Sequence, residues 1–228
     1  MKSFSSSKSI LALMLCGAAV IAPAQITQVK AAGFLTESIL YVPGRTFVQV
    51  NASQNDVRQE GARKFIESMA NRGIGFLSNP GVTREEQVAE FRGLLKDSFD
   101  MDTIGRFALG TYWRSASETQ RDQYLKLFQK RVINSYAERF SEYSGQVLEV
   151  RDSRPEGRRD ILVRSAILDN NGPEVSVDWR ARYENGSYKV IDIVVEGVSM
   201  ALTQRSDFAS VIQRGGGDIG VLIAHLKE

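Results

Sequence analysis

Between residues 175 and 183 apolar and polar side chains alternate without a break, and this pattern restricts the fold more than any other. The apolar set is Val175, Val177, Trp179, Ala181 and Tyr183, and the polar set is Ser176, Asp178, Arg180 and Arg182. A strand with this period of two places one set on each face of a sheet. The chain must therefore contain a sheet with one apolar face to cover.

Three further strands are predicted around this one, all after Gly145. They cover residues 147–150, 161–168 and 188–196, and a second apolar run at residues 198–202 extends the last of them past Gly197. The intervening stretches RPEGRR, DNNGPE and ENGS have the composition of tight turns. A meander of about four antiparallel strands is expected.

On both sides of the sheet the apolar residues recur at helical spacing. The spacing predicts helices over about residues 53–78, 84–99, 102–109 and 118–142, and two more over 207–214 and 219–226. Thr83 with Glu86 and Ser117 with Gln120 form capping boxes, and Ser206 is the predicted N-cap of the helix over 207–214. The fold class is α+β: N-terminal helices, a curved antiparallel sheet and C-terminal helices.

The first residues are organised like an export signal. Lys2 and Lys8 precede an apolar run at residues 10–22, and Ala22-Pro23-Ala24 fits the cleavage pattern. The run of about 13 residues is shorter than the roughly 20 that span a bilayer. We expect a signal peptide at residues 1–24, with cleavage as late as residue 32 as the alternative. A weakly patterned segment would follow at residues 25–52, and one domain at residues 53–228.

Cleavage would change the charge and thiol content of the chain. It removes Lys2 and Lys8, which account for the whole excess of 29 basic over 27 acidic residues. The balanced mature surface gives no support to nucleic-acid binding and favours a monomer. The only cysteine, Cys16, lies in the same segment, so the mature protein would have no disulfide and no thiol nucleophile.

Few side chains offer catalytic chemistry. The single histidine, His225, lies near the end of the chain and is expected to be solvated. Asp192, between Ile191 and Ile193, is the one candidate for a general base, which a small cone-fold enzyme could use. A structural aspartate, hydrogen-bonded and paired with an arginine of the neighbouring strand, is the favoured interpretation. We expect no catalytic residue, no metal site and no cofactor.

The chain supplies more large apolar side chains than one face of a four-stranded sheet needs. Residues 161–168 carry apolar residues at both odd and even positions, and the helices add their own stripes. The surplus fits a two-sided core. A two-sided core is the favoured interpretation of the surplus alone, and the alternative is an internal cavity that holds an apolar ligand.

Two long segments resemble a known family. FDMDTIGRFALGTYWRSASETQRDQYLKLFQ and YKVIDIVVEGVSMALTQRSDF are similar to sequence blocks of the MlaC/toluene-tolerance family of periplasmic phospholipid-binding proteins. The resemblance covers essentially the whole mature chain. Thr203-Gln204 departs from the Asn-Tyr of many members, and the VSMALTQRS wording is similar to the hopanoid-associated HpnM branch.

This resemblance implies a soluble periplasmic carrier rather than an enzyme. Such proteins carry phospholipid, or in the other branch a hopanoid, between an outer-membrane lipoprotein complex and an inner-membrane ABC transporter. The acyl chains would lie between sheet and helices. The residues predicted to line that pocket are Tyr112, Trp113, Val177, Trp179, Val194, Val198 and Met200. Arg114 and Arg205, also inside the similar segments, are expected first to be structural ion-pair partners and only second to be docking or head-group contacts.

Overall fold

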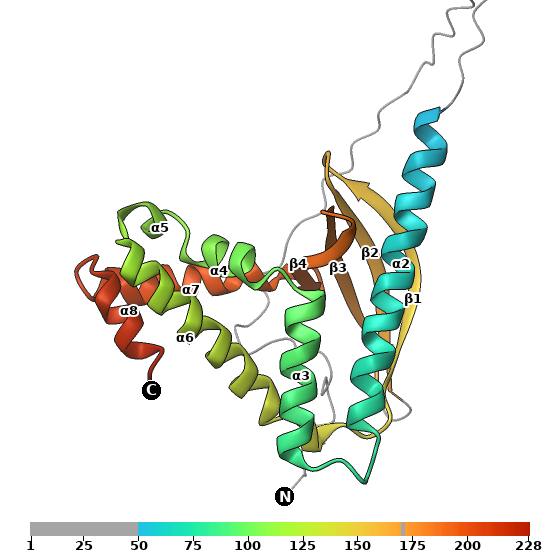
Figure 1. Ribbon diagram of the computed structural model, residues 1–228, viewed down its shortest axis with the longest axis horizontal. Helices are drawn as coiled ribbons and strands as arrows, with labels where there is room; N and C mark the ends of the chain where they lie inside the picture. Colours follow the sequence, from blue (N-terminus) through green and yellow to red (C-terminus); the bar gives the residue numbers. More distant parts are fainter. Residues whose placement is uncertain (1–49, 170–171) are drawn as a thin grey trace, which may run out of the picture.

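The computed structural model describes residues 50–169 and 172–228, so the predicted signal peptide and residues 25–49 lie outside it. Within these residues a group of helices precedes a sheet and two helices follow it (Figure 1). The elements are α2 (Val50–Leu77), α3 (Arg84–Ser98), α4 (Met101–Leu109), α5 (Tyr112–Ser115), α6 (Glu118–Ala137), a 3-10 turn (Phe140–Glu142), β1 (Val147–Glu156), β2 (Asp160–Leu168), β3 (Val175–Glu184), β4 (Ser187–Val195), β5 (Val198–Ser199), α7 (Met200–Arg214) and α8 (Ile219–His225). The predicted α+β class is confirmed.

The sheet is an antiparallel meander in which each strand pairs with the next, in the order β1-β2-β3-β4-β5. Two of its hairpins turn on pairs of residues with positive φ. Asn185 and Gly186 have φ values of 52° and 80°, and Glu196 and Gly197 have 49° and 79°. Two such residues in succession form a type I′ turn, whose twist matches that of the strands it joins. The second turn produces β5, a strand beyond the four predicted.

Three predicted boundaries were wrong. Ser199, not Ser206, caps α7, because its side chain accepts a hydrogen bond from the Leu202 amide. Most of the apolar run at residues 198–202 is therefore the first turn of a helix and not a strand. The helix predicted over 118–142 ends at Ala137, and α2, with 28 residues, is the longest helix in the described chain.

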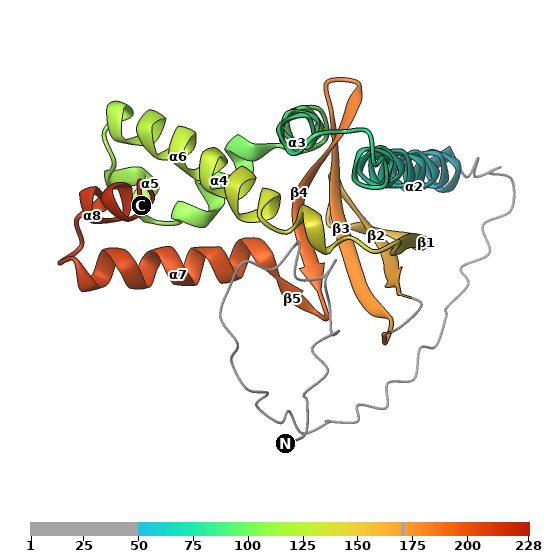
Figure 2. The same cartoon turned by 90° about the horizontal axis from the view of Figure 1, so that it is seen from below.

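Two hydrophobic cores organise these elements. The first, which we call the sheet core, joins the inner face of β1–β4 to α2 and α3. The second, the helical core, joins α4–α8 and stands to one side of the sheet (Figures 1 and 2). At its centre the fully buried Tyr124 donates its hydroxyl to the Gly105 carbonyl at 2.8 Å. Burial raises the pKa of the Tyr124 hydroxyl far above its usual value.

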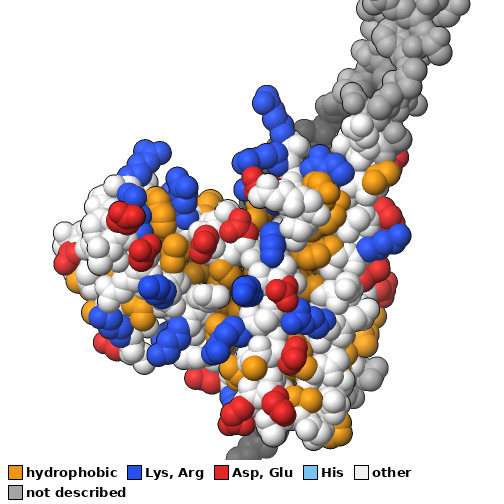
Figure 3. Space-filling model, in the orientation of Figure 1, with side chains coloured by type: hydrophobic (Ala, Val, Ile, Leu, Met, Phe, Trp, Pro, Cys, Tyr) orange, Lys and Arg blue, Asp and Glu red, His pale blue; other side chains and the backbone are white. Residues whose placement is uncertain are grey.

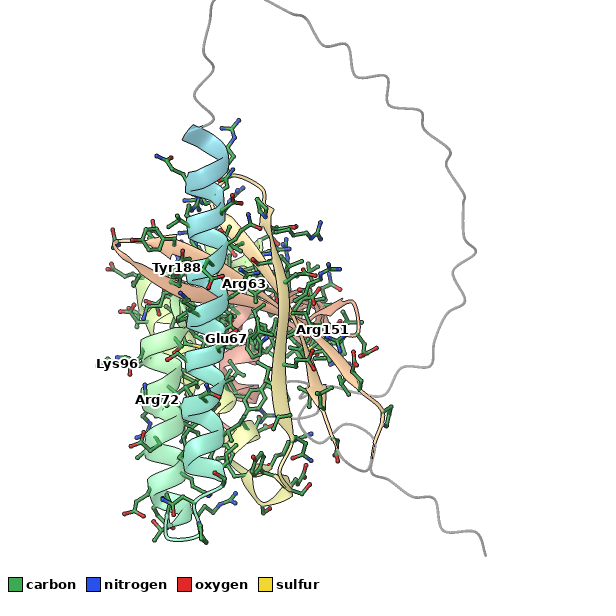
Figure 4. All side chains as sticks on the ribbon, turned by 90° about the vertical axis from the view of Figure 1, so that its right-hand side faces the viewer. Arg63, Glu67, Arg72, Lys96, Arg151 and Tyr188 are labelled. Atoms are coloured by element: carbon green, nitrogen blue, oxygen red, sulfur yellow. The ribbon has the colours of Figure 1, made fainter. Side chains whose placement is uncertain are left out.

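Helix α2 lies across the sheet between β1 and α3 (Figure 4). Near the N-terminal end of α2, the Tyr188 hydroxyl of β4 donates a hydrogen bond to the Arg58 carbonyl at 2.8 Å. The glycine at position 61 makes room for this hydroxyl, because a Cβ there would lie 2.6 Å from the Tyr188 hydroxyl oxygen. Further along, Arg72 donates to Asp97 of α3 at 2.8 Å, and this bond holds the pKa of the Asp97 carboxyl below its usual value. Being exposed, this ion pair orients the α2–α3 hairpin more than it stabilises it.

Candidate functional site

A cavity of about 240 Å³ lies where the sheet core and the helical core meet. Its wall takes side chains from both cores and is apolar apart from Tyr136, Asp192 and Gln204. The other lining residues are Met69, Ala70, Gly73, Ile74, Phe76, Leu77, Phe91, Leu94, Leu95, Phe99, Met101, Ile104, Phe128, Val132, Phe140, Leu148, Ile167, Trp179, Ile193, Met200 and Ala201. Apolar groups lining a concave space can hold an apolar molecule and offer it few hydrogen bonds.

Aromatic rings from α2, α3, α6 and the 3-10 turn form one part of this wall. The Phe91 ring of α3 lies edge-on to Phe140 with centroids 5.4 Å apart, and 5.9 Å from Tyr136 of α6. Phe140 also meets the edge of Phe76 of α2 at 6.0 Å. Edge-to-face contacts of this kind add to the stability gained from burying the rings. They join α2, α3 and the end of α6 around the cavity.

Trp179 brings the alternating strand β3 into the same wall. Its indole Nε1 donates to the Ser165 hydroxyl at 2.9 Å, and that hydroxyl donates to the Val177 carbonyl at 2.6 Å. The polar edge of the ring is therefore satisfied inside the sheet. The apolar remainder of the ring is left to line the cavity.

Asp192 is the one carboxylate in the wall, and its hydrogen bonds give it a structural role. It accepts from the backbone amides of Ile193 at 2.9 Å and Ala201 at 3.1 Å, and from the Ser199 hydroxyl at 2.7 Å. These bonds tie the first turn of α7 to β4. The predicted arginine partner was wrong: Arg180, opposite on β3, lies 3.6 Å from Glu156 instead, and no ion pair joins it to Asp192.

The structure places two of the predicted pocket residues, Trp179 and Met200, in the cavity wall. Val177 is fully buried on the same sheet face but belongs to the sheet core beside the cavity. The remaining four lie elsewhere. Val198 is 53% exposed on β5, and Tyr112 and Trp113 pack half-buried against the helical core.

Val194 lies on the opposite sheet face because the strand β4 contains a bulge. Arg180 pairs with Asp192 and the next residue, Ala181, pairs with Val190, so Ile191 is an extra residue between them. An extra residue reverses the alternation beyond it. Val194 therefore stands opposite Asp178, on the face away from Trp179.

Most of the wall comes from helices. The sequence shows the apolar stripe of each helix but not how closely the helices approach one another. Met69, Phe76 and Leu77 of α2, and Val132 and Tyr136 of α6, line the cavity. Their helical spacing predicts that each helix buries a face. Spacing says nothing about how closely two buried faces approach, and that separation decides between a solid core and a cavity.

The residues that the structure describes contain neither a membrane-spanning helix nor a group of side chains that could hold a metal ion. Within residues 50–169 and 172–228 no helix combines the length and apolar character that a membrane crossing requires. In the same residues His, Cys, Asp and Glu side chains do not gather in groups of three or more that could hold a metal ion.

The proteins similar to this chain include two curated relatives and one solved structure. The intermembrane phospholipid transport system binding protein MlaC of Haemophilus influenzae is 27% identical over 133 residues, 57% of this chain and 61% of that protein. The toluene tolerance protein ttg2D of Pseudomonas putida is 25% identical over 121 residues, 53% and 56% respectively. The match thus spans about three fifths of the length of these relatives.

The solved structure is that of a phospholipid-binding protein from Ralstonia solanacearum in complex with a phospholipid. It has a TM-score of 0.63 and 24% identity, and the match covers 73% of this chain and 94% of that one. This likeness establishes a shared fold. The family profile described as MlaC protein matches residues 57–228, which include both similar segments and every lining residue of the cavity. The chain therefore belongs to the MlaC family.

Proposed function

We propose that this protein is a lipid carrier that holds the acyl chains of a phospholipid in the cavity between its two cores. The observation that carries this proposal is the almost wholly apolar wall, to which both cores contribute. Asp192, the one carboxylate there, already has three donors within the protein. The site therefore suits the holding of an apolar molecule better than proton transfer.

The energetics of lipid transfer explain why such a wall is needed. Exposing one methylene group to water costs about 0.8 kcal/mol, so a two-chain lipid with roughly 30 methylenes faces about 24 kcal/mol on leaving a bilayer. A carrier lowers this barrier by replacing the bilayer interior with its own apolar side chains. That task requires no nucleophile, metal or cofactor.

The position of the cavity suits a large ligand. Its volume of about 240 Å³ lies just below the range of about 300–1,000 Å³ typical of small-molecule sites, so two acyl chains would have to widen it. Widening would have to loosen the contacts of Phe91 with Tyr136 and Phe140, which join α3 to the end of α6. We therefore expect α3 and the sheet to move apart from α6 and α7 when lipid enters.

The relatives support the nature of the cargo and the route. One is named for intermembrane phospholipid transport, and the solved neighbour contains a phospholipid. We propose the same class of cargo here, with the protein exported to the periplasm by residues 1–24. It would act as a monomer between an outer-membrane lipoprotein complex and an inner-membrane ABC transporter.

Native mass spectrometry of the protein purified without detergent, followed by solvent extraction, tests the cargo. A stoichiometric added mass that resolves into phospholipid is the expected result. A hopanoid in its place would keep the carrier role and change the ligand. A bare polypeptide mass that stays unchanged after incubation with phospholipid vesicles would contradict the proposal.

The location of the acyl chains can be tested separately with Trp179. In a Trp113→Phe variant Trp179 is the only tryptophan, and phospholipid brominated on its acyl chains should quench its fluorescence. Ala70→Phe should abolish quenching because it places a phenyl ring in the cavity. Ala89→Phe, on the exposed side of α3, is the matched control and should leave quenching intact. Equal quenching in both variants would place the chains elsewhere.

A further inference from the structure

Three arginines lie over two aromatic rings, and a fourth is next to one of these rings in the chain, at the corner formed by α4, α5, α6 and α7. The guanidinium carbons of Arg106 and Arg121 lie 5.7 and 5.2 Å from the centre of the Trp113 ring. That of Arg205 lies 5.4 Å from the Phe107 ring. Arg114, next to Trp113, is exposed. We call Arg106, Phe107, Trp113, Arg114, Arg121 and Arg205 the arginine–aromatic corner.

A glycine fixes the geometry of this corner. Gly110 ends α4 with φ of 63°, and a Cβ there would lie 2.8 Å from the Arg205 Nε. The guanidinium of Arg205 can therefore lie against the chain beside Phe107. This contact joins the two segments that resemble the family. Arg205, Phe107 and Trp113 lie in these segments but do not line the cavity.

The arginines of the corner differ from those of the sheet. On the outer side of the sheet, Arg164 donates to Asp152 at 2.7 Å and Arg182 to Asp160 at 2.7 Å. At the corner, among the described residues, none of the four arginines forms a salt bridge with a carboxylate. Arg121 donates instead to the Trp113 carbonyl at 2.8 Å. The predicted ion pairs of Arg114 and Arg205 were wrong, and the corner retains its positive charge.

The corner also exposes apolar surface and adjoins the cavity. Phe107 is 40% exposed, and Leu202, one turn before Arg205 on α7, is 56% exposed. Ile104, one turn before Phe107, and Gln204, next to Arg205, both line the cavity. In Figure 3 basic side chains stand beside apolar ones over this part of the helical core, with some acidic side chains between them. The same two helices, α4 and α7, thus carry the corner outside and part of the cavity wall inside.

We propose that the arginine–aromatic corner docks the protein on the surface of a bilayer that contains anionic phospholipid. Guanidinium groups bind phosphate oxygens through paired N–H donors, and aromatic rings favour the boundary between head groups and acyl chains. The arginines of the corner have no carboxylate partners in the part of the chain that the structure describes and can therefore bind the phosphates of the head groups. The exposed Phe107 and Leu202 beside them can contact the acyl chains below. Docking there would bring the cavity to the membrane. The use of this docking for lipid exchange rests on the proposed carrier function, whereas the docking itself does not.

Flotation with vesicles tests the docking. The purified protein should float with vesicles of phosphatidylglycerol and phosphatidylcholine in equal parts, and not with pure phosphatidylcholine. High salt should release it, because screening shortens the reach of exposed charges. Failure to float with the anionic vesicles at low salt would overturn the proposal and leave an acidic protein as the occupant that the corner fits.

Paired charge variants locate the docking surface. Arg106→Gln with Arg114→Gln should weaken vesicle binding about fivefold for each arginine removed. Arg84→Gln with Arg92→Gln removes two exposed charges from α3 and is the control. Equal weakening by both pairs would show that net charge, not the corner, is responsible, and would overturn the proposal. Phe107→Ser tests the apolar contribution without changing charge and should also weaken binding.

One variant separates docking from lipid carriage. Ala70→Phe, which fills the cavity, should still float with anionic vesicles although it takes up no lipid. Loss of flotation in this variant would mean that vesicle binding follows from cavity occupancy, which overturns the docking role. Conversely, wild-type protein that purifies with lipid but ignores anionic vesicles would sink the docking proposal while leaving the carrier function intact.

Discussion

At Gly61 one hydrogen atom in place of a side chain determines how closely α2 approaches the sheet. Alanine there should destabilise the protein by about 1–3 kcal/mol, because its Cβ would meet the Tyr188 hydroxyl at 2.6 Å and force the ring or the helix to shift. Helix propensity alone predicts the opposite, a gain of up to about 1 kcal/mol for alanine over glycine. Urea unfolding monitored by circular dichroism measures which effect is larger.

Gly75 in the same helix provides the matched control. No atom lies within 4 Å of a Cβ built there, so Gly75→Ala should show the propensity gain alone. A stabilising Gly61→Ala variant would contradict the close approach of Tyr188 to α2. Equal effects at the two glycines would mean that propensity alone decides both sites.

At the scale of the element, the start of α7 depends on one buried carboxylate from a neighbouring strand. Asp192→Ala leaves the Ala201 amide and the Ser199 hydroxyl without their acceptor, so it should cost about 2–4 kcal/mol. Ser199→Ala removes a helix cap and one of these bonds and should cost about 1 kcal/mol. Hydrogen exchange at the amides of residues 201–204, together with urea unfolding, measures both effects.

The conservative variant Asp192→Asn distinguishes this anchoring role from acid–base chemistry. An asparagine retains one oxygen for the two amides and can donate to the Ser199 hydroxyl, so we expect most of the stability and all of the lipid binding to persist. Lipid binding lost in Asp192→Asn with stability unchanged would assign the carboxylate to the ligand. An Asp192→Ala variant as stable as wild type would contradict the anchoring role.

This anchor also shows what local pattern can predict about an element and what it cannot. The capping boxes at Thr83 and Ser117 were confirmed because all their partners lie within four residues along the chain. The start of α7 was predicted wrongly because Asp192, which holds its first turn, is an acceptor from another element. The bulge at Ile191 was missed for a similar reason: its evidence is the pairing of β3 with β4, which alternation in one strand does not contain.

The cavity was only partly predictable, because it depends on the distance between the sheet core and the helical core. The strict alternation of β3 identifies Trp179 as an inward side chain, and Met200 lies in an apolar run that reaches the same wall. The surplus of apolar side chains alone favoured a two-sided core over a cavity, and only the family resemblance indicated the cavity. The choice rests on the separation of the sheet core from the helical core, which depends on the packing of many side chains together.

For the whole molecule, two cores that share one cavity wall make stability depend on what fills the cavity. A ligand that binds only the folded state stabilises it by an amount that grows with ligand concentration. The cavity side chains belong to both cores, so the added stability should reach both. Cavity-forming substitutions can therefore be used to detect the ligand through its effect on unfolding.

Phe91→Ala should destabilise the lipid-free protein by about 2–4 kcal/mol, since it removes the ring that contacts Phe140 and Tyr136 and enlarges the cavity. With lipid bound the cost should shrink, because an acyl chain can occupy the vacated space. Phe65→Ala is the matched control: Phe65 packs in the sheet core against Tyr188 but does not line the cavity, so its cost should not depend on lipid. Urea unfolding of each variant, before and after delipidation, measures these differences. If lipid reduces the cost of both substitutions equally, the ligand stabilises the fold without entering between the cores.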